Sequence, residues 1–162
     1  ALRKERKMED LNDVYNDLIM EHSMHSENKR ELKDADFEEM GHNPNCGDEI
    51  KLELKLDGDI IEELAFTGHG CAISQSSTSI MIDVLKGKTI KEAKEIIKTF
   101  IDMIKRETKS EEELEKLEEA IAFRNVANMP ARVKCALLAW HTIEDMLNED
   151  NNQGKNSINC CH

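Results

Sequence analysis

The sequence predicts an α+β fold, in which a small antiparallel β-sheet of about three strands packs against several α-helices. Two observations lead to this prediction. Between residues 50 and 57 apolar and charged residues alternate, which is the pattern of a strand with one buried face. From residue 72 onward, apolar residues recur at three- and four-residue spacing over several segments, as in amphipathic helices. Because the helical part is much the longer, we expect helices to cover one face of the sheet.

For the part of the chain before the sheet, the sequence predicts one helix and a polar connection. Apolar residues follow helical spacing from about Leu11 to His25, which predicts an amphipathic helix there. The segment Ser26–Gly41 is polar and charged, with Phe37 and Met40 as its few apolar anchors. We interpret it as a surface connection that leads into a turn.

Two strands joined by a tight turn follow. The alternating segment that begins at Ile50 is the first strand. Asp57-Gly58 is a dipeptide typical of hairpin turns, and Ile60–Thr67 supplies the returning strand.

Two helices are predicted directly after the hairpin. The first begins after Cys71, and Gly87 ends it. Thr89 and Glu92 have the spacing of a capping box, which predicts a second helix that runs to about Glu107.

Two further helices complete the predicted fold. Ser110 and Glu113 repeat the capping signal for a strongly acidic helix toward Ile121. Pro130 opens the last helix, from Ala131 to about Leu147. We therefore expect one domain over residues 11–147, an N-terminal extension over residues 1–10, and a flexible polar tail over residues 148–162.

Composition excludes several classes of function. The chain has 162 residues, of which 35% are charged, and a formal net charge of −12. An acidic surface argues against binding to nucleic acid or to an anionic membrane, since both require a basic face. No apolar run approaches the roughly 20 residues that span a bilayer. We expect a cytoplasmic protein with neither a nucleic-acid nor a membrane partner.

The five cysteines indicate metal binding or thiol chemistry more than disulfides, because their number is odd and the chain has the character of an intracellular protein. They are Cys46, Cys71, Cys135, Cys160 and Cys161. The first three are far apart in the sequence, so any site they share must be assembled by the fold.

The turn from Asn43 to Asp48 has the clearest chemical character. Pro44 and Gly47 restrict its backbone in different ways, and Cys46 and Asp48 are two residues apart. In an extended segment such residues point the same way, so a thiol and a carboxylate can converge. An ordinary polar turn that happens to contain a cysteine is the alternative.

The hairpin offers a second thiol to this turn. Its outer ends lie together, so Cys71 should meet Cys46 and Asp48 at one edge of the sheet. Cys71 also stands at the expected start of a helix, where the helix dipole stabilises a thiolate. Cys135 joins them if the last helix packs across this edge. Three thiolates and a carboxylate are a reasonable ligand set for zinc. The spacing in the sequence does not decide the role of Cys135, because a buried structural cysteine explains it nearly as well as a metal ligand does.

Three motifs carry a resemblance to a known family. They are the segments 41–48 (GHNPNCGD), 68–77 (GHGCAISQSS) and 131–140 (ARVKCALLAW). In this order they resemble the IscU/NifU-N family, and more closely its SufU branch, over roughly Leu11 to Leu147. Scaffold proteins of the IscU branch typically carry a histidine before the last cysteine, where this chain has Lys134. Residues 88–119 resemble the helical insertion of the SufU branch.

The resemblance implies an IscU/SufU-like fold and a zinc-dependent sulfurtransferase. This protein would accept persulfide sulfur from a SufS-type cysteine desulfurase, stimulate it, and supply a downstream Suf cluster-assembly scaffold for iron–sulfur cluster biogenesis. By the same resemblance the zinc ligands are Cys46, Asp48, Cys71 and Cys135, and Cys46 is the persulfide acceptor. It has activity only together with the desulfurase.

Arg132 matches an arginine of the family motif, three residues before Cys135 on the same helical face. It is expected to support catalysis by steadying Asp48 or a persulfide anion. An ordinary solvated helix charge is the alternative.

Two other functions remain open at this point. One is a scaffold that assembles a [2Fe-2S] cluster on the same ligands, and the other is a structural zinc domain that mediates interactions. Of the histidines, His42 and His69 are expected to form hydrogen bonds near the site, and His22 to be a packing residue of the first helix. For Cys160, Cys161 and His162 we expect adventitious metal binding or oxidation.

Overall fold

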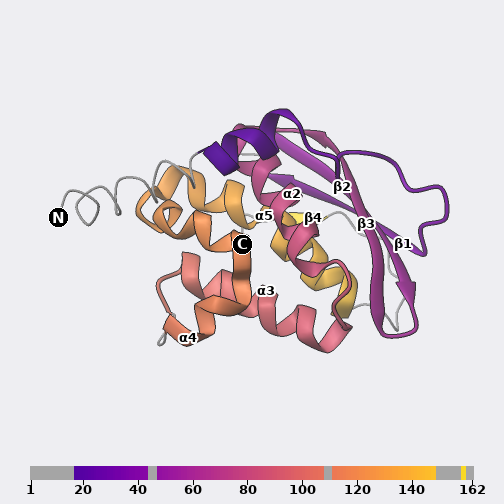
Figure 1. The fold of residues 1–162 in the computed structure, drawn as a ribbon. Coiled ribbons are helices and arrows are strands. Elements are labelled where there is room, and N and C mark those ends of the chain that lie inside the picture. Colours follow the sequence, from indigo (N-terminus) through magenta and orange to yellow (C-terminus); the bar gives the residue numbers. More distant parts are fainter. Residues whose placement is uncertain (1–16, 44–46, 108–110, 149–157, 160–162) are drawn as a thin grey trace.

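The computed structural model describes residues 17–43, 47–107, 111–148 and 158–159, and it has the predicted α+β architecture (Figure 1). A β-sheet forms one layer and the helices lie against one of its faces. Within the described residues no helix is both long and apolar enough to cross a bilayer.

The sheet contains three antiparallel strands and a short fourth one. Strands β1 (Phe37–Asn43), β2 (Asp48–Asp57) and β3 (Ile60–His69) pair in sequence order, and β4 (Ile158–Asn159) pairs in parallel with the free edge of β1. The predicted hairpin is confirmed as β2 and β3. Its register places Glu49 opposite His69, so the beginning of β2 and the end of β3 meet at one edge of the sheet.

Strand β1 corrects the sequence interpretation, which placed a surface connection over Ser26–Gly41. The alternating pattern is hidden because the positions that face the helices are occupied by Phe37, Glu39, Gly41 and Asn43, of which only Phe37 is a large apolar residue. Gly41 allows α5 (Pro130–Asn148) to pack closely on the strand, since a Cβ atom there would lie 2.3 Å from Thr142 Oγ1. Antiparallel pairing with β2 and packing against α5, not hydrophobic periodicity, make this segment a strand.

Two helices form the layer next to the sheet. Helix α2 (Ala72–Leu85) packs on β3, and α5 packs on β1 and β2. The two helices also contact each other, where Ser77 Oγ of α2 donates a hydrogen bond to the Ala136 carbonyl at 2.6 Å. Both were predicted, and their bounds agree with the sequence prediction to within a few residues.

The remaining helices lie on the far side of α2 and α5 from the sheet. They are α3 (Ile90–Ile104), α4 (Glu111–Leu114) and the 3₁₀ segment η1 (Glu115–Asn128). The Thr89 cap of α3 is confirmed, since its Oγ1 accepts the Glu92 N–H at 3.1 Å. Residues 17–24 form the described part of the predicted N-terminal helix, and residues 11–16 lie outside the described residues.

The predicted acidic helix toward Ile121 is wrong as a single α-helix. Its proposed cap, Ser110, lies outside the described residues, and only Glu111–Leu114 is α-helical. Glu118 has φ 50° and ψ −122°, which interrupts the regular backbone. Leu114, Leu117 and Ala120 are nevertheless buried, so tertiary packing and not helix propensity determines this conformation.

Trp140 is a packing residue of the core. Its ring is fully buried and stacks on Phe100, with centroids 3.9 Å apart and an angle of 8° between the rings. The indole N–H donates to Ser77 Oγ at 3.0 Å. This contact links α5 to α2 five residues after Cys135.

Candidate metal centre

Asp48 is the first residue of β2 and is completely buried. The chain just after β3 approaches it closely. A Cβ atom on Gly70 would lie only 2.6 Å from Asp48 Oδ1, so any larger residue at this position would displace the carboxylate. The start of β2 and the chain just after β3 therefore lie in close contact at the Asp48 carboxylate.

Cys71 is the N-cap of α2, as the sequence predicted. Its backbone N–H donates to Asp48 Oδ1 at 2.9 Å, and its thiol lies 4.0 Å from Asp48 Oδ2. The sulfur in turn accepts the Ser74 N–H at 3.4 Å. The unpaired N–H groups at the start of a helix favour negative charge, so this position suits a thiolate.

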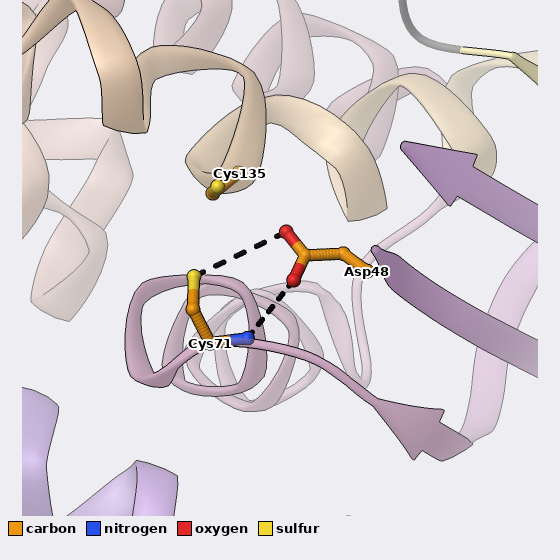
Figure 2. Close-up of side chains that lie close together, drawn as sticks. All are labelled: Asp48, Cys71 and Cys135. Carbon is orange, nitrogen blue, oxygen red and sulfur yellow. Dashed lines mark hydrogen bonds between the residues drawn. The ribbon is translucent and has the colours of Figure 1, made fainter. Parts of the chain in front are cut away.

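Cys135 completes the cluster from the opposite side. It lies on α5 and is 1% exposed. Figure 2 shows Cys135 on a helix that lies across from Asp48 and Cys71. One carboxylate oxygen and the two sulfur atoms all lie within 4.8 Å of one another. Three elements that are distant in the sequence therefore bring their polar atoms to one point.

Arg132 stands one turn before Cys135, on the exposed side of the cluster. The charge of Cys71 and a hydrogen bond to the Cys135 sulfur raise the pKa of Arg132 above its usual value. Its guanidinium therefore places positive charge beside the two sulfurs. The sequence suggested Asp48 or a persulfide as its partner, and the structure brings it to the thiols instead.

The other candidates of the sequence analysis take different positions. Cys46 lies outside the described residues, as do Cys160, Cys161 and His162. His42 and His69 are exposed at the ends of β1 and β3, and neither belongs to the ligand cluster of the described residues. Sequence reasoning missed the close approach of Gly70, and the glycine immediately before the helix cap is the signal that indicates it.

The donor set fits a thiophilic metal such as zinc. Tetrahedral zinc with Zn–S bonds of about 2.3 Å separates its ligand atoms by roughly 3.8 Å. The observed separations, up to 4.8 Å, need a contraction of at most about 1 Å. Carboxylate oxygen and cysteine sulfur are both common zinc ligands.

Comparisons with known proteins decide the family. Residues 14–153 match the family model of the NifU-like N-terminal domain. The chain belongs to this family. It is 41% identical over 134 residues to the zinc-dependent sulfurtransferase SufU of Bacillus subtilis, which covers 83% of this chain and 89% of the relative. It is 35% identical over 143 residues to the iron–sulfur cluster assembly scaffold protein IscU of Streptococcus pyogenes serotype M1, with 88% and 87% covered.

A solved structure agrees with both the fold and the branch. The putative iron–sulfur cluster assembly scaffold protein for the SUF system from Fervidobacterium islandicum AW-1 superimposes with a TM-score of 0.75. It is 42% identical, and the match covers 80% of this chain and 93% of that structure. The predicted resemblance to the IscU/NifU-like family and its SufU branch is therefore supported, and the IscU/SufU-like α+β fold is confirmed.

Proposed function

We propose that this chain is a zinc-dependent sulfur acceptor, which takes persulfide sulfur from a SufS-type cysteine desulfurase for iron–sulfur cluster biogenesis. The observation that carries the proposal is the convergence of Asp48, Cys71 and Cys135 at one edge of the sheet. The similarity to a sulfurtransferase that is named zinc-dependent supports it. A Suf cluster-assembly scaffold is the proposed downstream recipient. The cytoplasm is the proposed compartment, because reduced thiols persist there.

Asp48, Cys71, Cys135 and Cys46 are the proposed zinc ligands. Cys46 lies outside the described residues and is two positions before Asp48 in the sequence. Asn43 and Gly47 are joined by a backbone hydrogen bond of 2.9 Å across the three residues between them. When bound, zinc holds cysteine side chains as thiolates at neutral pH and protects them from oxidation.

The proposed reaction is a transfer of one sulfur atom between two cysteines. The thiolate of Cys46 attacks the outer sulfur of the desulfurase persulfide, and a new S–S bond forms. The S–S bond of the donor breaks, and the donor cysteine leaves as a thiolate that takes up a proton. No net oxidation or reduction occurs, so no further reagent is needed.

The neighbouring residues of the chain have distinct parts in this proposal. Asp48 is held by the Cys71 N–H and fixes the edge of the site. Arg132 lies on the exposed side, beside the sulfurs of Cys71 and Cys135, and offers its charge to an incoming persulfide anion. The helix start at Cys71 adds a favourable dipole.

A scaffold for a [2Fe-2S] cluster is the second candidate, and the similarity to scaffold proteins named IscU favours it. Lys134 stands where that branch typically has a histidine. Because of this difference we rank the scaffold function second. Anaerobic reconstitution distinguishes the two functions. A stable cluster that passes intact to an apo-protein would reverse the ranking. A structural zinc domain is the third candidate. An Asp48→Ala variant that folds, keeps zinc and retains full activity would favour it.

The proposal is tested by desulfurase turnover in the presence of the full chain. We expect the wild-type protein, with one zinc bound at this site, to accelerate alanine release from cysteine by a SufS-type enzyme, and Cys46→Ala to lose the acceleration. Cys160→Ala/Cys161→Ala is the matched thiol control and should retain it. Full acceleration by Cys46→Ala would show that the acceptor assignment is wrong.

A further inference from the structure

A second group of potential ligands lies away from the Asp48 cluster. His22 Nε2 is 3.7 Å from Asp83 Oδ2 and 4.0 Å from Glu119 Oε2. The three ligand atoms all lie within 4.8 Å of one another. They come from the helix of residues 17–24, from α2 and from η1, so the group forms only in the folded chain.

Residues behind the group hold two of its members in place. Asn28 Nδ2 donates to Asp83 Oδ1 at 2.9 Å, which leaves Oδ2 directed at His22. His22 Nδ1 lies 2.7 Å from Ser79 Oγ, and Ser79 Oγ lies 2.6 Å from Ser26 Oγ. Ligating histidines and carboxylates in metal sites are commonly oriented by such outer hydrogen bonds. The sequence interpretation of His22 as a packing residue did not anticipate this network.

The network is compatible with the tautomer that a metal ligand needs. When Nδ1–H donates to Ser79 Oγ, the Ser79 hydroxyl donates to Ser26 Oγ, and Nε2 presents a lone pair toward the oxygens of two carboxylates. In the other tautomer Ser79 donates to Nδ1, and Nε2–H faces the same oxygens. In the first tautomer the three ligand atoms can share one cation.

The surroundings favour a cation. A hollow at this place is lined by Glu21, His22, His25, Glu27, Asn28, Ser79 and Asp83. Among these described lining residues there is no lysine or arginine, and the basic side chains of the lining are the two histidines, His22 and His25. Water reaches the ligand group, because the side chains of Asp83, which lines the hollow, and of Glu119, which lies outside its lining, are 45% and 53% exposed.

We propose that His22, Asp83 and Glu119 bind one divalent first-row transition-metal ion, with water in the remaining positions. Metal–ligand bonds of about 2.1 Å require ligand atoms about 3.0 to 3.4 Å apart. The two distances from Nε2, 3.7 and 4.0 Å, exceed this range by about 0.3 to 1.0 Å, which half-exposed side chains can close. Imidazole with carboxylates suits Mn²⁺, Fe²⁺ and Zn²⁺.

This site is separate from the proposed sulfur-transfer centre. Cys71 caps the start of α2, while Asp83 lies near its end, twelve residues and about 18 Å further along the helix. A bound ion joins the N-terminal helix to α2 and η1. The proposal therefore stands or falls independently of the proposed sulfur transfer.

Mn²⁺ is the probe, because it prefers oxygen and imidazole ligands to thiolates and so reports on this site and not on the cysteines. Mn²⁺ is titrated into the full chain, and paramagnetic line broadening of amide resonances locates the ion. We expect saturable broadening centred on His22, Asp83 and Glu119, with no comparable centre at Cys71 and Cys135. Broadening spread over the acidic surface, or centred elsewhere, would overturn the proposal.

Charge-matched variants make the test quantitative. Asp83→Asn and Glu119→Gln each remove one proposed ligand charge, and we expect each to weaken Mn²⁺ binding by about tenfold or more. Glu27→Gln removes an equal charge from the lining of the hollow without touching a ligand, and should weaken binding by less than about threefold. Thermal unfolding checks that each variant is folded. Equal effects of all three variants would show diffuse attraction by acidic residues and not a site.

Discussion

Gly70→Ala is the perturbation that tests the geometry of the Asp48 cluster most sharply. A Cβ atom at this position would lie 2.6 Å from Asp48 Oδ1, 3.0 Å from its Cγ and 3.2 Å from its Cβ. Ordinary van der Waals contact begins at about 3.4 Å, so the carboxylate must move by about 0.8 Å. Asp48 is fully buried, so its carboxylate cannot turn out into solvent without a change in the structure around it.

The displacement has two measurable consequences. Overpacking of this kind costs about 1 to 3 kcal/mol of folding free energy, which denaturant unfolding of the metal-free protein measures. The carboxylate also leaves its position beside Cys71, so zinc affinity should fall by about tenfold or more, as for other changes that misplace a ligand. Competition with a chromophoric chelator measures the affinity.

Gly87→Ala is the matched control. Gly87 has φ 86°, so alanine is strained there, but its Cβ would meet nothing within 4 Å. This variant should lose stability and keep wild-type zinc affinity. If Gly70→Ala binds zinc as tightly as the wild-type protein, with unchanged stability of the metal-free form, the enclosed carboxylate is not part of a metal site.

Three further predictions concern other parts of the molecule. Arg132→Gln should slow persulfide transfer in single-turnover experiments while leaving the melting temperature unchanged, because the side chain is exposed and lies beside the sulfurs; an unchanged rate would leave it as a solvated helix charge. Trp140→Phe removes the indole hydrogen bond to Ser77 and part of a buried ring, and should cost about 2 to 4 kcal/mol in denaturant unfolding; a cost below about 1 kcal/mol would contradict the packing described. Burial is the main cause that lowers the pKa of His141 from 6.5, opposed by Glu144 and Asp145 and assisted by Lys105. Since its pKa in the folded state lies below that of the unfolded state, stability should fall as the pH drops below about 6.5, and His141→Gln should reduce this slope in urea unfolding between pH 7 and 5; an unchanged slope would contradict the assignment.

The hairpin and the main helices could be predicted from local sequence, because their signals are local. The alternation after Ile50 and the Asp57-Gly58 turn are sufficient for β2 and β3. Strand β1 could not be found in this way, since Glu39, Gly41 and Asn43 occupy positions that face the helices. The interruption at Glu118 has no local signal either, and it depends on packing against α2 and α3.

Part of the candidate site could likewise be predicted from local sequence, and part of it could not. The pairing of Asp48 with Cys71 follows from the hairpin, whose two outer ends must meet. Cys135 reaches them only because α5 packs across this edge, and the spacing of cysteines does not contain that information. The position of Arg132 beside the sulfurs likewise depends on the tertiary structure.

The central claim is that Cys46 receives sulfur at a site formed with Asp48, Cys71 and Cys135. It is tested most directly by mass spectrometry of the full chain after incubation with a SufS-type desulfurase and ³⁴S-labelled cysteine, with alkylation before digestion. We predict one labelled sulfur on Cys46 and none on Cys71 or Cys135. A label on another cysteine, or no label under conditions in which the desulfurase itself is persulfidated, would contradict the account.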